Sequence, residues 1–203
     1  MFLQKSLRAQ ILALLGGSLA LILITALACF SFLSGGMQAY RGLLEGPLEA
    51  SRLIDSANVE FKIQVQEWKN VLLRGQDSDS LNKYWSQFEA QERKVQDILG
   101  ELAVLASDDA AMKSQVERLR SEHQTLGANY RKGRDAFVAA GGDSKAGDAA
   151  VKGIDRAASE QMSALVSQLH EQGLAQAKQI NAGAERTILL GSLVMLAASV
   201  VIA

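Results

Sequence analysis

The feature that most constrains this chain is the placement of its charges, because two long segments have none. No charged residue occurs between Ala9 and Tyr40, and the part from Ile11 to Leu33 is strongly apolar. A helix needs roughly 20 such residues to cross a bilayer, so the sequence predicts a first membrane span at residues 11–33. Residues 187–203 form a second uncharged run, which predicts a second span that the end of the sequence cuts short.

The basic residues before the first run predict its orientation. Lys5 and Arg8 precede it with no acidic residue nearby. The positive-inside rule therefore places residues 1–10 in the cytoplasm and residues 34–186 on the other side of the membrane. A cleaved signal peptide is the competing interpretation, but its apolar core is typically about 7–15 residues, shorter than this run. An uncleaved anchor is the preferred interpretation.

Composition limits the fold and the partners. The chain has 203 residues, of which one is proline, one is cysteine and 5% are aromatic. So few helix breakers among many good helix formers favour a nearly all-helical protein. A formal net charge of −1 gives no reason to expect a nucleic-acid partner. The single Cys29 cannot form a disulfide within the chain.

Between the two uncharged runs, apolar residues recur at spacings of three and four, which is the pattern of packed helices. In chain order, the four stripes contain Ile54, Phe61, Val65, Trp68 and Leu72; Leu81, Tyr84, Phe88, Val95, Ile98, Leu102 and Leu105; Met112, Val116, Leu119, His123, Leu126, Tyr130 and Phe137; and Val151, Ile154, Ala158, Met162, Leu165, Leu169 and Ile180. Short connections make neighbouring helices antiparallel. The sequence therefore predicts an all-α protein: a membrane-anchored, antiparallel, up-down-up-down four-helix bundle between two transmembrane helices.

Turn and capping residues predict where these helices end. Gly75 follows a basic last turn and is expected to end the first helix. Asp77 can cap the second helix, and Ser107, which precedes two acidic residues, is expected to cap the third. Residues 141–148 are expected to form a loop before the fourth helix. Pro47 is expected to loosen or kink the junction after the first span.

This layout resembles the sensor half of a bacterial methyl-accepting chemotaxis protein. The N-terminal KSLRAQILALLGGSLALILI is similar to many such receptors, and VEFKIQVQEWKNVLLRG followed by LNKYWSQFE resembles a recurrent segment of their four-helix sensor domains. The resemblance implies a multi-pass protein of the bacterial inner membrane with a periplasmic bundle, acting as a homodimer. Such receptors continue into a HAMP linker and a cytoplasmic coiled coil that controls the chemotaxis kinase and its adaptor, and this sequence contains neither.

The resemblance also implies where a ligand would bind. In bundles of the aspartate-receptor type, the ligand lies at the dimer interface in the membrane-distal half. The candidate ligand-binding residues at the corresponding helix ends are Lys62, Lys69, Asn70, Arg74, Trp85, Arg131 and Arg134. Lys62, Lys69 and Asn70 share one helix face, and cations beside amides suit a carboxylate or another small anion. The alternative is a solvated or intersubunit surface.

Other side chains have simpler interpretations. Helical spacing places Trp68 in the core, whereas Trp85 follows the stripe residue Tyr84 and is expected to contact a ligand or a second subunit. His123 lies on an apolar stripe with no second metal ligand, which favours a hydrogen-bonded core histidine. No metal-binding, haem, phosphate-loop or nucleophile motif occurs, so we expect no metal, no cofactor and no enzymatic activity.

The sequence therefore predicts a transmembrane chemoreceptor module that detects a small periplasmic signal, either directly or through a periplasmic binding protein. Two alternatives remain open. The same architecture serves as the sensor region of histidine kinases and cyclic-dinucleotide enzymes, and a structural membrane-anchored bundle without a ligand would show the same periodicity.

Overall fold

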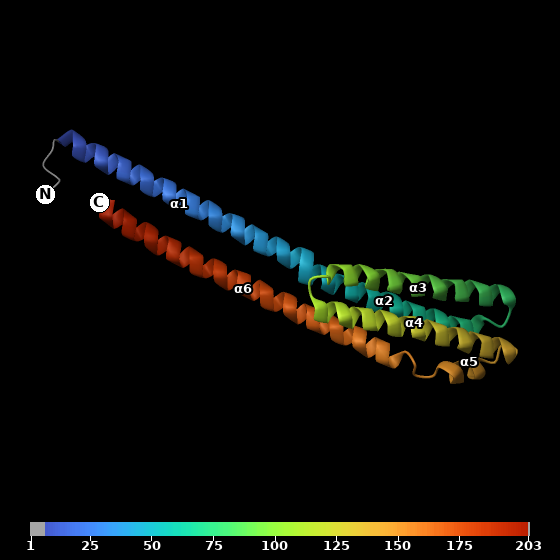
Figure 1. Cartoon of the computed structure of the whole chain (residues 1–203). Coiled ribbons are helices and arrows are strands. Elements are labelled where there is room, and N and C mark those ends of the chain that lie inside the picture. The colour runs from blue at the N-terminus through green and yellow to red at the C-terminus, as the bar shows by residue number, and fades with distance from the viewer. Residues whose placement is uncertain (1–6, 203) are drawn as a thin grey trace. The chain divides into compact units, whose positions relative to one another are not determined.

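The computed structural model describes residues 7–202, with side chains described as far as residue 196. Within this range the chain is helical with short turns and contains no strand (Figure 1). In chain order, the elements are α1 (Leu7–Leu43), the π-helical turn η1 (Leu44–Leu48), α2 (Glu49–Arg74), α3 (Ser78–Leu105), α4 (Ala110–Ala139), α5 (Ser144–Val151) and α6 (Arg156–Ile202). The predicted all-α class is confirmed.

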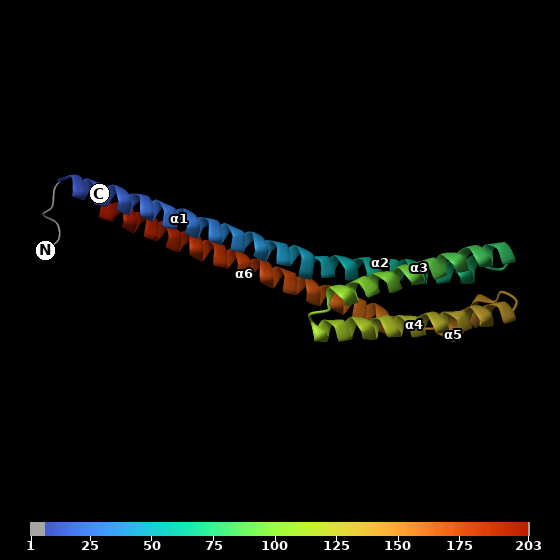
Figure 2. The ribbon, with the colours of Figure 1, turned by 45° about the horizontal axis from the view of Figure 1, so that its top comes forward.

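The chain divides into two compact units. The first, here called the apolar unit, contains the residues up to Glu45 and those from Leu174 onward, and the second, the core unit, contains Gly46–Gly173. Within the apolar unit, α1 and the C-terminal part of α6 lie side by side (Figures 1 and 2). The Tyr40 hydroxyl donates a hydrogen bond to Asn181 Oδ1 at 2.6 Å and joins these two helices.

Exposed apolar side chains cover α1. Leu12 is 70% exposed, Ile22 65% and Phe30 74%. Among the described residues, one helical stretch, Leu7–Arg74, contains a window long and apolar enough to cross a membrane by length and composition. The predicted cytoplasmic segment 1–10 falls partly on residues 1–6, which lie outside the described residues. The predicted second span, 187–203, likewise includes side chains outside them, so both assignments stay predictions.

The junction after α1 alters the helix without ending it. The glycines at 35 and 36 lie inside α1, and Pro47 lies inside η1. Proline has no N–H to donate, and a π-helical turn accommodates the resulting gap in the hydrogen-bond ladder by inserting a residue. The chain then continues directly into α2.

The core unit is built from amphipathic helices that pack α2 against α3, α3 against α4, and α4 against α5. The largest fully buried apolar side chains are Ile54, Phe61, Phe88, Leu99, Leu102, Leu119, Tyr130, Phe137, Met162, Leu165 and Leu169. Removing one such side chain from water contributes about 1.5–3 kcal/mol, which makes this cluster the main source of stability. Most of the predicted stripe residues therefore lie where periodicity placed them.

The residues predicted to cap the second and third helices can be compared with the N-caps that the structure shows for α3 and α4. Asp77 Oδ1 accepts a hydrogen bond from the Ser80 N–H at 2.9 Å, so the predicted cap of α3 is confirmed. The prediction that Ser107 caps the third helix is wrong. Asp109 is the cap instead, and its Oδ1 accepts from the N–H groups of Ala111 and Met112 at 3.1 and 3.0 Å. Ser107 belongs to the preceding turn, where its N–H donates to the carbonyl of Val104.

The predicted fourth helix is two helices. The chain turns at Gly141 and Gly142, whose φ angles of +67° and +89° favour glycine, and α5 starts at Ser144. The expectation of a loop throughout 141–148 is therefore wrong for its second half. A second turn at 152–155, with Gly153 at φ +75°, separates α5 from α6. The helix that runs on into the second apolar run thus begins only at Arg156.

Candidate ligand-binding site

The predicted ligand-binding residues come from three helices of the core unit. α2 carries Lys62, Lys69, Asn70 and Arg74, α3 carries Trp85, and α4 carries Arg131 and Arg134. Some of these residues line one of two separate surface grooves, and Arg131 belongs to an ion-pair network. They do not form a single cationic cluster.

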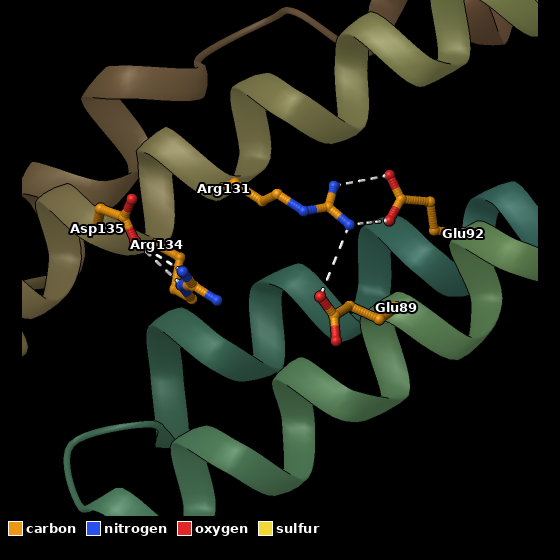
Figure 3. A network of polar contacts seen from close by, with 5 residues as sticks. All are labelled: Glu89, Glu92, Arg131, Arg134 and Asp135. Carbon is orange, nitrogen blue, oxygen red and sulfur yellow. Dashed lines mark hydrogen bonds and ion pairs between the residues drawn. The ribbon is translucent and has the colours of Figure 1, made fainter.

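Arg131 is occupied by acidic partners (Figure 3). Its two terminal nitrogens donate to the two carboxylate oxygens of Glu92 at 2.9 and 2.7 Å, and Glu89 Oε1 lies 3.6 Å away. The hydrogen bonds to Glu92 raise the pKa of the Arg131 guanidinium above its usual value. Because the pair is bidentate, an anionic ligand would have to compete with Glu92 for the same donors.

Arg134 forms part of a groove between α3 and α4. Its guanidinium carbon lies 4.6 Å from the centroid of the Trp85 ring, and its Nε and a terminal nitrogen donate to Asp135 Oδ1 at 3.2 and 2.9 Å. The groove, called here the α3–α4 groove, has a volume of about 420 Å³ and is lined by Leu81, Asn82, Trp85, Arg134, Asp135, Val138 and Ala139. Its one cation is thus partly neutralised by its neighbour Asp135.

The environment of Trp85 corrects the predicted seam of α3. Trp85 is 7% exposed and stacks on Phe88, with ring centroids 4.8 Å apart. Tyr84 is only half-buried, and its hydroxyl accepts a hydrogen bond from Arg74 at 3.4 Å. Trp85 is therefore the more deeply buried of the two, against expectation, while Tyr84 packs against the core from its edge as its stripe position predicted. Trp68 is 3% exposed, as expected for a core residue.

Lys69 lies in a second groove, between α2 and α5. This α2–α5 groove has a volume of about 310 Å³ and is lined by Lys69, Leu72, Leu73, Ser144, Lys145 and Asp148. Neither lysine ammonium has a hydrogen bond or an ion pair within the described part of the chain. The sequence pattern missed Lys145 because the segment was assigned to a loop, and a recognised Asp143 cap before Ser144 would have indicated the helix.

The remaining two predicted residues line neither groove. The Asn70 amide donates to Glu67 Oε2 at 3.0 Å and is half-buried. Lys62 is exposed on α2, two turns before Lys69, and no ion pair involves it in the range the structure describes. Of the face that Lys62, Lys69 and Asn70 were expected to share, only Lys69 therefore lines a groove.

His123 is a hydrogen-bonded core histidine, as expected. It is fully buried, and its Nε2 lies 2.8 Å from Gln64 Oε1 while its Nδ1 lies 2.7 Å from Gln96 Nε2. An amide oxygen only accepts and an amide nitrogen only donates, so the ring is neutral and carries its proton on Nε2. Burial lowers the pKa of His123 to about 4, which agrees with the neutral form.

Comparison with known proteins finds a chemotaxis protein that is similar to this chain in sequence. The chain is 58% identical over 201 residues to the methyl-accepting chemotaxis protein CtpH of Pseudomonas aeruginosa. The chain is a relative of a bacterial methyl-accepting chemotaxis protein. The match covers 99% of this chain and about a third, 35%, of the chemotaxis protein. The expected resemblance is confirmed, although no protein-family model and no solved structure matches the chain.

Proposed function

We propose that this chain is the sensing region of a bacterial chemoreceptor, which detects a small anionic signal in the periplasm and transmits it across the inner membrane. The observation that carries the proposal is the 58% identity to a methyl-accepting chemotaxis protein over nearly the whole chain. Control of the chemotaxis kinase and adaptor would belong to a cytoplasmic region of a longer protein. The same identity favours this output over a histidine kinase or a cyclic-dinucleotide enzyme.

The proposed topology has two membrane spans around a periplasmic up-down-up-down bundle. Spans at 11–33 and 187–203 would flank a domain of residues 34–186, with the N-terminus in the cytoplasm. The exposed apolar side chains of α1 and the compact core unit of Gly46–Gly173 support this division. A ligand would act through its different affinities for two bundle states, typically about 1–3 kcal/mol of coupling.

The proposed assembly is a homodimer formed through α2. Val59 is 54% exposed, Ile63 37% and Leu73 67%, and their spacing of four and ten residues places them on one stripe. Exposed apolar side chains on one side of a helix, here with Gln66 and Asn70 between them, favour contact with another protein surface. A second copy of the chain, related by a two-fold axis, would bury the same stripe on both subunits.

Free cationic groups at the end of the core unit support an anionic ligand. Lys69 has no ion-pair partner among the described residues, whereas Arg131 and Arg134 do. Trp85 and Arg134, which line the α3–α4 groove, stay candidates for a second contact. The signal would arrive as the free anion or with a periplasmic binding protein.

Two experiments test the proposed function. In the first, the 203-residue chain in lipid nanodiscs is heated with sodium succinate, glutamate, sulfate or phosphate at constant ionic strength. A ligand at a hundred times its Kd stabilises the folded state by about 2.7 kcal/mol, so we expect at least one anion to raise Tm.

The second experiment measures output. Residues 1–203 replace the matching region of the Pseudomonas aeruginosa relative, and kinase activity is followed in membranes with and without each anion. We expect the anion that raises Tm to change kinase activity. If none of the four anions stabilises the chain or regulates the chimera, direct sensing of these anions is wrong, and a structural bundle is favoured.

A further inference from the structure

We infer that the anion binds in the α2–α5 groove, between Lys69 of α2 and Lys145 of α5. The inference rests on the proposed function and assigns its ligand to one groove within a single subunit. It adds Lys145, which no sequence pattern indicated, and it leaves the ion-paired arginines of α4 outside the binding site.

The position of α5 against α2 and α4 is set by close glycine contacts. A Cβ added at Gly147 would lie 2.6 Å from Leu72 Cδ2 and 3.0 Å from Phe137 Cβ. A Cβ at Gly133 of α4 would lie 2.6 Å from Cγ1 of Val151, the last residue of α5. A side chain at either glycine would force its neighbours to shift, so α5 is packed closely at its middle and at its C-terminal end. Lys145 is therefore presented to the groove by a packed helix and not by a mobile loop.

The charges that line this groove favour an anion. Lys69 and Lys145 are the cations, and Asp148 is the only acid among the lining residues. No ion pair joins these three side chains in the part of the chain that the structure describes. Two ammonium groups therefore face one carboxylate, which leaves the groove with a net charge of +1. Each ammonium carries three donors that water alone would otherwise satisfy.

The apolar floor of the groove strengthens this preference. Leu72, which lines the groove, is 8% exposed and contacts the α5 backbone at Gly147. Both lysines are exposed, and Leu72 gives them an apolar neighbour, which strengthens their attraction to an anion relative to ammonium groups surrounded by water alone. A volume of about 310 Å³ is large enough for a small carboxylate or oxyanion.

The α3–α4 groove is the weaker candidate for the anion. Its Arg134 guanidinium donates to Asp135 at 2.9 Å and covers the Trp85 ring, so it has fewer free donors. Arg131, which lies 5.9 Å from the same ring, is bound by Glu92. Binding an anion there would first require breaking one of these contacts.

The test measures the affinity of the 203-residue chain in nanodiscs for succinate, glutamate, sulfate and phosphate by titration calorimetry. Losing a hydrogen bond to a charged group should cost about 1.5–3 kcal/mol, so Lys69→Ala and Lys145→Ala should each weaken binding about tenfold or more. Lys113→Ala, at an exposed lysine of α4 outside the groove, is the matched control and should leave affinity unchanged. Circular dichroism checks that each variant keeps its helicity.

Hydrogen–deuterium exchange of the wild-type chain provides an independent readout. Saturating anion should slow exchange of amides in residues 144–151, because the ligand would hold α5 against α2. Binding that is weakened by Lys62→Ala but not by Lys145→Ala, or protection confined to α3 and α4, would overturn the groove while leaving anion sensing intact. No binding of any of the four anions to the wild type would overturn both the groove and the anionic signal.

Discussion

The Nε2–H of His123 donates to Gln64 Oε1 at 2.8 Å, and both side chains are fully buried between α4 and α2. On the other side of the ring, Nδ1 accepts from Gln96 of α3 at 2.7 Å. One imidazole thus joins three helices of the core unit. The orientation of the Gln96 amide is set in turn by its contacts with Arg120 and Gln124, which donate to its oxygen at 3.2 and 3.3 Å.

This arrangement predicts that the stability of the core unit decreases in acid. The pKa of His123 falls from 6.5 in the unfolded chain to about 4 in the folded one, because burial disfavours the charged ring. The unfolded state therefore binds the extra proton first, and stability present above pH 6.5 is lost as the pH falls toward 4. We expect a loss of about 2–3 kcal/mol across this window, measured by urea denaturation at a series of pH values.

His123→Gln is the control for this pH dependence. The variant lacks the titrating ring, so its stability should change less between pH 6.5 and 4.5, with carboxylates providing the remaining slope. An equal pH slope in wild type and variant would show that His123 does not cause the acid sensitivity.

Gly147→Ala should destabilise the core unit. The new Cβ would lie 2.6 Å from Leu72 Cδ2, so α5 or the leucine must shift, at a typical cost of about 1–3 kcal/mol. Gly100→Ala is the matched control, because its Cβ would meet nothing closer than Arg120 Cζ at 3.7 Å. In that open helical position alanine should instead stabilise by about 0.5–1 kcal/mol. Opposite shifts of Tm would support the close contact, and similar shifts would contradict it.

The Arg131–Glu92 pair should contribute more to stability than the Arg134–Asp135 pair. Glu92 is 13% exposed and bound by two hydrogen bonds, whereas Asp135 is 67% exposed. Double-mutant cycles to alanine should give about 1 kcal/mol of coupling for the first pair and less than about 0.5 kcal/mol for the second. Adding 0.5 M sodium chloride should reduce the second coupling more than the first. Equal coupling energies for the two pairs would show that the burial of Glu92 does not strengthen its interaction with Arg131.

Asp109→Ala should cost about 1 kcal/mol, because two N–H groups at the start of α4 would lose their acceptor. Ser107→Ala should change the free energy of unfolding by only a few tenths of a kcal/mol, since its side chain accepts no capping hydrogen bond among the described residues. Chemical denaturation of both variants distinguishes the observed cap from the one that the sequence suggested. A larger loss for the serine variant would mean that α4 starts earlier than the structure indicates.

The sequence by itself determined the helical class and most of the core, because both depend on local periodicity and on the scarcity of breakers. His123 shows how far this reasoning reaches. Its place on an apolar stripe predicted a buried, partnered histidine, but Gln64 lies 59 positions away and could not be named from spacing. Relatedness to a chemotaxis protein was likewise indicated by layout and one recurrent block, and the comparison confirmed it.

Tertiary structure alone decided which of several locally equivalent residues does what. Tyr84 and Trp85 both lie three or four positions before Phe88, so periodicity could not select Trp85 for the core. Arg131 appeared as a free cation until Glu92 was brought to it from another helix. Lys69 and Lys145, 76 positions apart in a sequence of 203, line one groove only because α5 packs against α2. Spacing along the chain determines the face of a helix, whereas packing between helices determines what that face meets.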